Sequence, residues 1–224
     1  MAAITLLTVQ NTRRVSAVDV LSPELVEAQV REALEDIPPG AAKTGALGNE
    51  KIVRMLARLA EEFNFPLVVD PVMISKHGHA LLTEAARRAL AESLLPRAYL
   101  VTPNLQEAAE LSGISVRDVE SMERAAEKII SLGARGALIK GGHLEGDAVD
   151  VLRFGNETVL LTSPRVETRH THGTGCVYSA CITAELAKGN LTKDAVATAK
   201  EFITRAIATA PGLGQGSGPV NHFA

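Results

Sequence analysis

The segment TRHTHGTGC, residues 168–176, places two glycines and a cysteine directly before a run of small helix-forming residues. The first turn of a helix has backbone N–H groups without intrahelical partners, and the helix dipole makes that end positive. Because glycine has no β-carbon, Gly173 and Gly175 would let the backbone approach a ligand closely. The segment therefore predicts a cradle for an anion, most commonly a phosphate. The alternative is an ordinary glycine-containing loop before a core helix.

Three charged residues follow short apolar segments that are typical of buried strands. Asp70 ends PLVVD, Glu107 lies one turn beyond AYLVTPN, and Lys140 ends GALIK. In a parallel α/β sheet the loops at the carboxyl ends of the strands bind ligands. Two carboxylates, a lysine and an anion cradle are the groups needed to hold a nucleoside triphosphate with magnesium. Each residue alone also fits a structural role, such as a solvated lysine or an acidic residue in a first helical turn.

Apolar segments with strand character alternate along the chain with amphipathic helical segments. We expect strands or hairpins within residues 3–9, 41–48, 66–70, 98–104, 136–142 and 148–163. We expect helices to begin near Ser22, Asn49, Thr83, Gly175 and Thr192, with two further helices before residue 132. This alternation predicts one α/β domain over residues 1–224, with a mostly parallel sheet covered by helices on both faces.

Two more detailed expectations concern burial. The first apolar segment, AAITLLTVQNT, lacks a basic lead-in and reads as a buried strand rather than a signal peptide. In the helix after Gly175, three-and-four spacing predicts a buried face. That face comprises Val177, Ala180, Cys181, Ala184 and Ala187.

Composition and charge exclude several classes of function. The net charge of −3, the 3% aromatic content and the lack of a basic stripe argue against a nucleic-acid partner. No apolar segment is long enough to span a membrane. A dinucleotide-binding oxidoreductase is disfavoured because no G-x-G-x-x-G follows an early strand. Cys176 and Cys181 are poorly placed for a disulfide on one helix, which fits a reduced, cytoplasmic location.

Five motifs in order carry a family resemblance. DPVM, VTPNLQEA, LIKGGHLEG, RHTHGTGC and GPVNHF resemble the hydroxymethylpyrimidine/phosphomethylpyrimidine kinases of thiamine biosynthesis, which have a three-layer α/β/α, ribokinase-like fold. The resemblance implies ATP- and magnesium-dependent phosphorylation of hydroxymethylpyrimidine and then of its monophosphate. Pyridoxal is the alternative substrate, because relatives in the same branch phosphorylate it.

The resemblance also implies roles for individual residues. Cys176 stands where the superfamily usually has an aspartate acting as general base, and a helix N-terminus favours the thiolate. Asp70 and Glu107 would hold magnesium, largely through water. The nucleotide phosphates would contact Lys140, Thr171, Gly173, Thr174 and Gly175. The backbone N–H groups at Gly173 and Gly175 would also stabilise the transferring phosphoryl group.

On the substrate side, Gln10 matches the family glutamine that hydrogen-bonds the aminopyrimidine, since a carboxamide both donates and accepts. Ala46 and Val72 would form the pocket wall, and Ala46 replaces a methionine found in many relatives. His77 and His79 lie in a segment that resembles the family's mobile loop, and we expect a solvated loop there rather than a metal site.

The front of the chain departs from the family pattern. Relatives begin with a strand and a loop resembling AGSDxSGGAG, followed by a helix, whereas this sequence starts at the next strand. We therefore expect an open strand edge that favours a homodimer or leaves the chain marginally stable. An intact anion cradle without that substrate loop also fits a catalytically impaired, nucleotide-binding relative.

Overall fold

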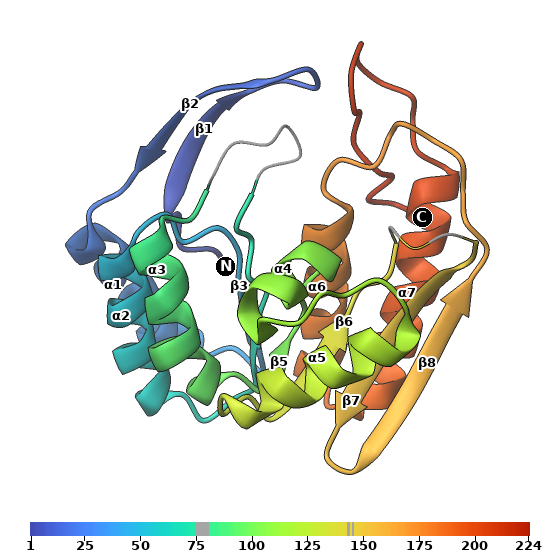
Figure 1. Ribbon diagram of the computed structural model, residues 1–224. Helices are drawn as coiled ribbons and strands as arrows, with labels where there is room; N and C mark the ends of the chain where they lie inside the picture. Colours follow the sequence, from blue (N-terminus) through green and yellow to red (C-terminus); the bar gives the residue numbers. More distant parts are fainter. Residues whose placement is uncertain (75–80, 143, 145) are drawn as a thin grey trace.

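The central element of the protein is a six-stranded sheet (Figure 1). The computed structural model describes residues 1–74, 81–142, 144 and 146–224. The strands lie in chain order across the sheet: β3 (Ala42–Thr44), β4 (Leu67–Val69), β5 (Leu100–Val101), β6 (Gly136–Ile139), β7 (Ala148–Phe154) and β8 (Glu157–Ser163). β3 to β6 pair in parallel, while β7 and β8 add an antiparallel hairpin at one edge. The predicted mostly parallel α/β sheet is confirmed.

Helices cover both faces of this sheet. One face carries α1 (Pro23–Asp36), α2 (Glu50–Leu59), α3 (Glu84–Ala89), α4 (Leu105–Ser112) and α5 (Val119–Ser131). The other face carries α6 (Thr174–Ala187) and α7 (Thr192–Ala208). Neighbouring residues of β4 alternate between the two cores, since Val69 packs with the first group and Val68 with the second. The same strand therefore contributes side chains to both hydrophobic cores, one on each face of the sheet.

Capping side chains set where several helices begin. Ser22, Asn49 and Thr83 each accept a hydrogen bond from a backbone N–H in the first turn of α1, α2 and α3. α2 continues into a 3₁₀ turn at Ala60–Glu62. α3 continues into a π-helical turn at Leu90–Leu94 and a 3₁₀ turn at Leu95–Arg97. These starts agree with the capping residues predicted from the sequence.

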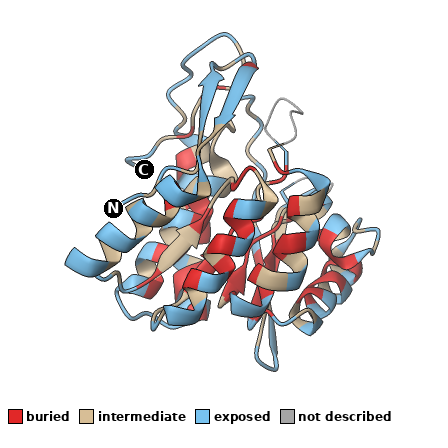
Figure 2. Cartoon of the chain, turned by 90° about the vertical axis from the view of Figure 1, so that its left-hand side faces the viewer, coloured by how far each residue is buried: buried red, intermediate tan, exposed pale blue. Residues whose placement is uncertain are grey.

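A separate two-stranded ribbon stands away from the sheet. It consists of β1 (Leu6–Gln10) and β2 (Val15–Val20), which pair with each other antiparallel. Figure 2 shows the ribbon largely in the colour of exposed residues above the buried core of the sheet. Leu7 is 55% exposed and Val9 is 64% exposed, so the expectation of a buried first strand was wrong. The reason is that β1 gains only β2 as a neighbour and does not join the main sheet.

The buried face of α6 also differs from the expectation. Its buried side chains are Tyr178, Ser179, Ile182, Thr183 and Leu186. The predicted face was wrong at Ala180, Ala184 and Ala187, which are exposed, whereas Val177 and Cys181 are half-buried against the core beneath α6. The large apolar side chains recur every four residues and bury more area against the sheet than the alanines would. Both cysteines are free thiols.

None of the helices in the described part of the chain is long and apolar enough to cross a membrane.

Candidate active site

The candidate site lies at the carboxyl ends of the parallel strands. Asp70 directly follows β4, Lys140 directly follows β6, and Glu107 lies in the first turn of α4 after β5. The amide N–H of Lys140 donates to the carbonyl of Pro103 at 2.9 Å, which ties the end of β6 to the loop after β5. The expectation that these charged residues meet at one edge of the sheet is confirmed.

The carboxylate of Asp70 is the centre of a buried hydrogen-bond network. Lys140 donates its Nζ to Oδ1 at 3.1 Å, and the Thr102 hydroxyl lies 3.3 Å from the same oxygen. Ser179 donates its hydroxyl to Oδ2 at 3.0 Å. Asp70 is 2% exposed and accepts bonds from β6, from the end of β5 and from α6. It therefore links two strand ends to the helix that carries the anion cradle.

Lys140 extends from the end of β6 to the first turn of α6. A β-carbon built on Gly175 would lie 3.2 Å from the Nζ of Lys140. Burial lowers the pKa of Lys140, but the carboxylates of Asp70 and Glu107 raise it by more, so the pKa lies above its usual range. The ammonium is therefore charged at neutral pH and lies beside the backbone of the cradle.

The first turn of α6 has the geometry expected of an anion cradle. Gly173 is its N-cap with a φ of +82°, and no side chain caps the free N–H groups. The amide and hydroxyl of Thr174 both donate to the carbonyl of Thr171, at 3.3 and 2.7 Å. The amide of His172 donates to Gly218 at 3.0 Å. The loop is thus held from both sides, while no side chain caps the N–H groups of Gly175 and Cys176 in the first turn.

The thiol of Cys176 lies in the same first turn, and the residue is exposed to solvent. Desolvation by the surrounding protein and the negative charge of Asp70 raise its pKa, although Lys43 and Lys140 partly oppose them. The expectation of a favoured thiolate was therefore wrong. Desolvation and the charge of the aspartate outweigh the two lysines, so the thiol is mostly protonated at neutral pH.

Glu107 forms a capping box with Asn104 at the start of α4. Its Oε2 accepts the Asn104 amide at 2.8 Å, while the Asn104 side chain accepts the Glu107 amide at 2.9 Å. Burial raises the pKa of Glu107, the charge of Lys140 opposes this, and the charge of Asp70 adds to it. Within the described residues, no group of three histidine, cysteine or acidic side chains converges as a metal site. A magnesium role for Asp70 and Glu107 stays a prediction.

The predicted pyrimidine-binding residues come from three separate segments. Gln10 is exposed at the end of β1, and its Nε2 lies 3.3 Å from Nε2 of His172 in the cradle loop. Ala46 follows β3 and accepts a hydrogen bond from the Thr5 hydroxyl at 2.6 Å. Val72 follows β4. A shared substrate pocket for these residues stays a prediction, and His77 and His79 lie outside the described residues.

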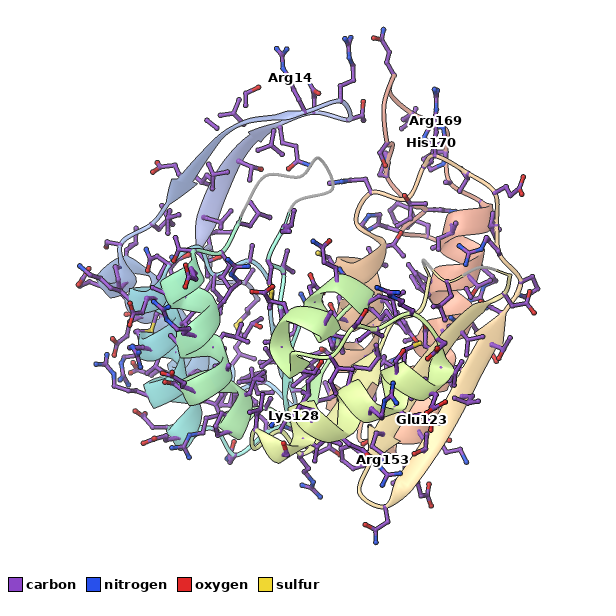
Figure 3. All side chains as sticks on the ribbon, in the orientation of Figure 1. Arg14, Glu123, Lys128, Arg153, Arg169 and His170 are labelled. Carbon is purple, nitrogen blue, oxygen red and sulfur yellow. The ribbon has the colours of Figure 1, made fainter. Side chains whose placement is uncertain are left out.

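Basic side chains gather around this end of the molecule. Figure 3 shows Arg14 on the turn of the ribbon, and Arg169 and His170 on the loop before α6. Both segments lie on the side of the sheet where the parallel strands end (Figure 1). A phosphate-bearing ligand approaching the cradle would therefore meet positive charge.

Sequence reasoning missed three polar residues of this region. Thr102 follows β5 directly, Ser179 lies one turn after Cys176, and Lys43 lies within β3. The rule that strand ends line the site could have found Thr102. The i, i+3 spacing from Cys176 was the available signal for Ser179, since both residues lie on one side of the helix.

Comparisons with known proteins agree with this geometry. The family model for phosphomethylpyrimidine kinase matches residues 1–221. A hydroxymethylpyrimidine/phosphomethylpyrimidine kinase of Streptomyces coelicolor is 46% identical over 222 residues, 99% of this chain and 82% of that protein. The thiamine biosynthesis bifunctional protein ThiED of Geobacter sulfurreducens is 46% identical over 224 residues, 99% of this chain and 46% of that protein. An ADP complex of Bacillus subtilis pyridoxal kinase has a TM-score of 0.91 at 39% identity, covering 99% of this chain and 85% of that one.

Proposed function

This chain belongs to the phosphomethylpyrimidine kinase family, and from that premise we propose that it phosphorylates hydroxymethylpyrimidine and then its monophosphate in thiamine biosynthesis. The phosphoryl donor is ATP. The observation that carries the proposal is the position of Lys140, between the carboxylate of Asp70 at 3.1 Å and the uncapped first turn of α6. A lysine beside free N–H groups is the arrangement that binds and stabilises a transferring phosphoryl group.

In this proposal the cradle and Lys140 act on the γ-phosphoryl group. The N–H groups of Gly175 and Cys176, which no side chain caps, donate to its oxygens, on which negative charge is spread during transfer. Lys140 offsets part of that charge, while Asp70 fixes the direction of the ammonium through the 3.1 Å bond. The carbonyl of Thr171 holds Thr174 in place, and we assign the Thr171 side chain to the nucleotide phosphates.

Asp70 and Glu107 are the carboxylates that we assign to magnesium. The charge of Asp70 raises the pKa of Glu107, so the two acidic groups are close enough for a shared cation to relieve their repulsion. Both carboxylates already accept protein hydrogen bonds, which favours contact through water. When bound, magnesium neutralises phosphate charge and aligns the nucleotide.

Cys176 is the proposed general base for the first transfer. Its thiolate removes the proton of the substrate hydroxymethyl group, whose oxygen forms the new bond to the γ-phosphorus. The bond from that phosphorus to the bridging oxygen breaks, and ADP leaves. Because the pKa of the thiol is raised, the thiolate fraction at neutral pH is small and increases as the pH rises.

The second transfer differs because the acceptor is a phosphate oxygen. A phosphate monoester has a second pKa of about 6, so this oxygen carries no proton at higher pH. No base is required for it to attack the γ-phosphorus. Cys176 should therefore matter more for the alcohol acceptor than for the phosphate acceptor.

The proposal is tested by measuring ADP release with three acceptors: hydroxymethylpyrimidine, its monophosphate and pyridoxal. We expect turnover with both pyrimidines and a higher kcat/KM than with pyridoxal. A chain that turns over only pyridoxal would support the second candidate, which the similarity to a pyridoxal kinase favours. Nucleotide binding without transfer to any acceptor would instead identify a catalytically impaired relative.

A homodimer is a further part of the proposal. Leu7 and Val9 lie two residues apart on one face of β1, and both are more than half exposed. A second copy of the ribbon could cover this face, and an isolated two-stranded ribbon is otherwise only marginally stable in water. Sedimentation equilibrium should give twice the monomer mass. The paired substitutions Leu7→Ser and Val9→Ser should shift the protein to monomer, and a monomeric parent would contradict the dimer.

A further inference from the structure

Lys43 differs from every other lysine that the structure describes. Lys140, Lys188 and Lys200 are each paired with a carboxylate. A second group is exposed: Lys51, Lys128 and Lys193. Lys43 is partly buried, and within the described residues it has neither a salt bridge nor a side-chain hydrogen bond. An ammonium that no carboxylate pairs is available to bind an anion.

The register of β3 places this side chain on the α6 face of the sheet. Lys43 pairs with Val68, and residues opposite one another on adjacent strands share a face. Val68 belongs to the core beneath α6 and α7, as does Ala41, two residues before Lys43. α6 packs directly against β3 and β4. The side chain of Lys43 therefore lies on the side where the anion cradle begins.

The ammonium also extends toward the carboxyl edge of the sheet. A β-carbon built on Gly45, the residue directly after β3, would lie 3.7 Å from the Nζ of Lys43. The charge of Lys43, like that of Lys140, opposes the rise in the pKa of the Cys176 thiol. Lys140 lies beside Gly175 at the end of β6, whereas Lys43 lies on β3, on the face of the sheet that α6 covers. The reacting end of an acceptor near Cys176 would thus have a second cation beside it.

We propose that Lys43 binds the phosphate group of a phosphorylated acceptor, and so determines the efficiency of the second transfer. The inference rests on the proposed function. In that transfer a phosphate oxygen of the acceptor forms a bond to the γ-phosphorus, and the bridging oxygen leaves with ADP. The acceptor then carries about two negative charges close to those of the γ-phosphoryl group. Lys140 already shares its charge with Asp70 at 3.1 Å, whereas Lys43 is available to this added anion.

The two transfers should consequently depend on different side chains. An alcohol acceptor has no charge for Lys43 to bind, but it has a proton that Cys176 must remove. A phosphate acceptor has the charge and lacks the proton at neutral pH. Substitutions at residues 43 and 176 should therefore change the ratio of the two kcat/KM values in opposite directions.

The experiment compares Lys43→Met with Lys43→Arg, which keeps the charge, and with Lys51→Met, which removes an exposed lysine from α2. For each variant, kcat/KM is measured with hydroxymethylpyrimidine and with its monophosphate at pH 7.5. Calorimetry without ATP measures the affinity for both acceptors, and thermal melting confirms that each variant is folded.

For Lys43→Met we expect kcat/KM for the monophosphate to fall at least tenfold more than that for the alcohol. The affinity for the monophosphate should fall in parallel, and Lys43→Arg should recover most of both losses. Equal losses for the two acceptors would overturn the inference and place Lys43 at the thiol or the γ-phosphoryl group. Unchanged monophosphate affinity would also overturn it. A parent chain that phosphorylates neither pyrimidine would contradict the proposed function instead, and monophosphate affinity would still test Lys43.

Discussion

Two buried lysine–aspartate pairs lie in different regions of this molecule. Lys140 and Asp70 are 3.1 Å apart at the carboxyl edge of the parallel strands. Lys200 and Asp150 are 2.7 Å apart between α7 and β7. The side chains of the first pair are 13% and 2% exposed, and those of the second pair are 10% and 4% exposed. Burial and distance therefore do not distinguish the pair that we assign to the active site from the other pair.

The surroundings of the two pairs do distinguish them. Lys200 donates a second bond to the carbonyl of Ala148 at 2.9 Å, and Asp150 accepts the Gly141 amide at 2.9 Å. Both members of that pair therefore also bond backbone groups, and the bond to Asp150 holds Gly141, the residue that follows Lys140. Lys140, by contrast, donates one hydrogen bond, to the carboxylate of Asp70, and its Nζ lies beside Gly175 in the uncapped turn of α6. A buried ion pair next to unsatisfied N–H groups indicates a ligand, whereas one with its donors occupied indicates structure.

The largest expected effect is that of Lys140→Met. Removing the ammonium should lower kcat/KM for both acceptors by roughly 10²–10³-fold, because the charge developing on the γ-phosphoryl group loses a preorganised partner. The free energy of unfolding should change less than for Lys200→Met, because Asp70 keeps bonds from Thr102 and Ser179. Steady-state kinetics and urea unfolding measure the two quantities. A kcat/KM within threefold of the parent would contradict the assignment of Lys140 to the site.

Lys200→Met should show the opposite pattern. It leaves the carboxylate of Asp150 buried without its cation, which costs about 3–5 kcal/mol of unfolding free energy. Below the melting transition, kcat/KM should stay within about tenfold of the parent. Adding Asp150→Leu should recover part of the stability, since the unpaired charge is then absent. A Lys200→Met protein that is as stable as the parent but inactive would contradict the proposed difference between the two pairs.

The pH dependence of the first transfer tests the assignment of Cys176 as the base. A base must be deprotonated to act, and the pKa of Cys176 is raised, so kcat/KM for the alcohol should increase with pH from 6 to 8. The slope should approach tenfold per pH unit below that pKa. Cys176→Asp supplies a base that is already ionised at pH 6, and its profile should be flat. The monophosphate reaction should show a weaker dependence, and identical profiles for both acceptors would contradict the base assignment.

Ser179→Ala should have a smaller effect. It removes the 3.0 Å bond from α6 to Asp70 and leaves Oδ2 without its donor, which costs about 1–3 kcal/mol of stability. The KM for ATP should rise several-fold, because the cradle is no longer tied to the end of β4, while kcat changes less. Thr183→Val is the control, since its hydroxyl bonds the Ser179 carbonyl one turn further from the site. Equal KM values in the two variants would make Ser179 purely structural.

Local chemistry was enough to predict much of this fold and site. Capping residues such as Asn49 and Thr83 act within one turn, so their helix starts could be read directly. Asp70, Glu107 and Lys140 followed from the rule that parallel strands present their carboxyl ends at one edge. The helix start without a side-chain cap followed from the two glycines, and its role as an anion cradle stays a prediction.

The features that could not be predicted depend on distant contacts. β1 is exposed because it pairs with β2 and does not join the six-stranded sheet, and the first eleven residues alone do not reveal this pairing. The bond between Ser179 and Asp70 joins residues 109 positions apart. The raised pKa of Cys176 depends on desolvation by the surrounding protein and on that same aspartate, which is distant in the sequence. Contacts between residues far apart in the sequence therefore determine these features.

The central claim is that the first turn of α6, beside Lys140, holds the nucleotide phosphates. The most direct test is the thermal stabilisation of Gly175→Val by a non-hydrolysable ATP analogue with magnesium, compared with Ala180→Val at an exposed position of the same helix. A β-carbon at residue 175 already lies 3.2 Å from the Nζ of Lys140, and valine adds two methyl groups at the cradle. At a ligand concentration about 100 times Kd, the parent and Ala180→Val should each gain roughly 2.7 kcal/mol. Gly175→Val should remain folded and gain almost nothing, whereas a gain equal to that of the parent would contradict the account.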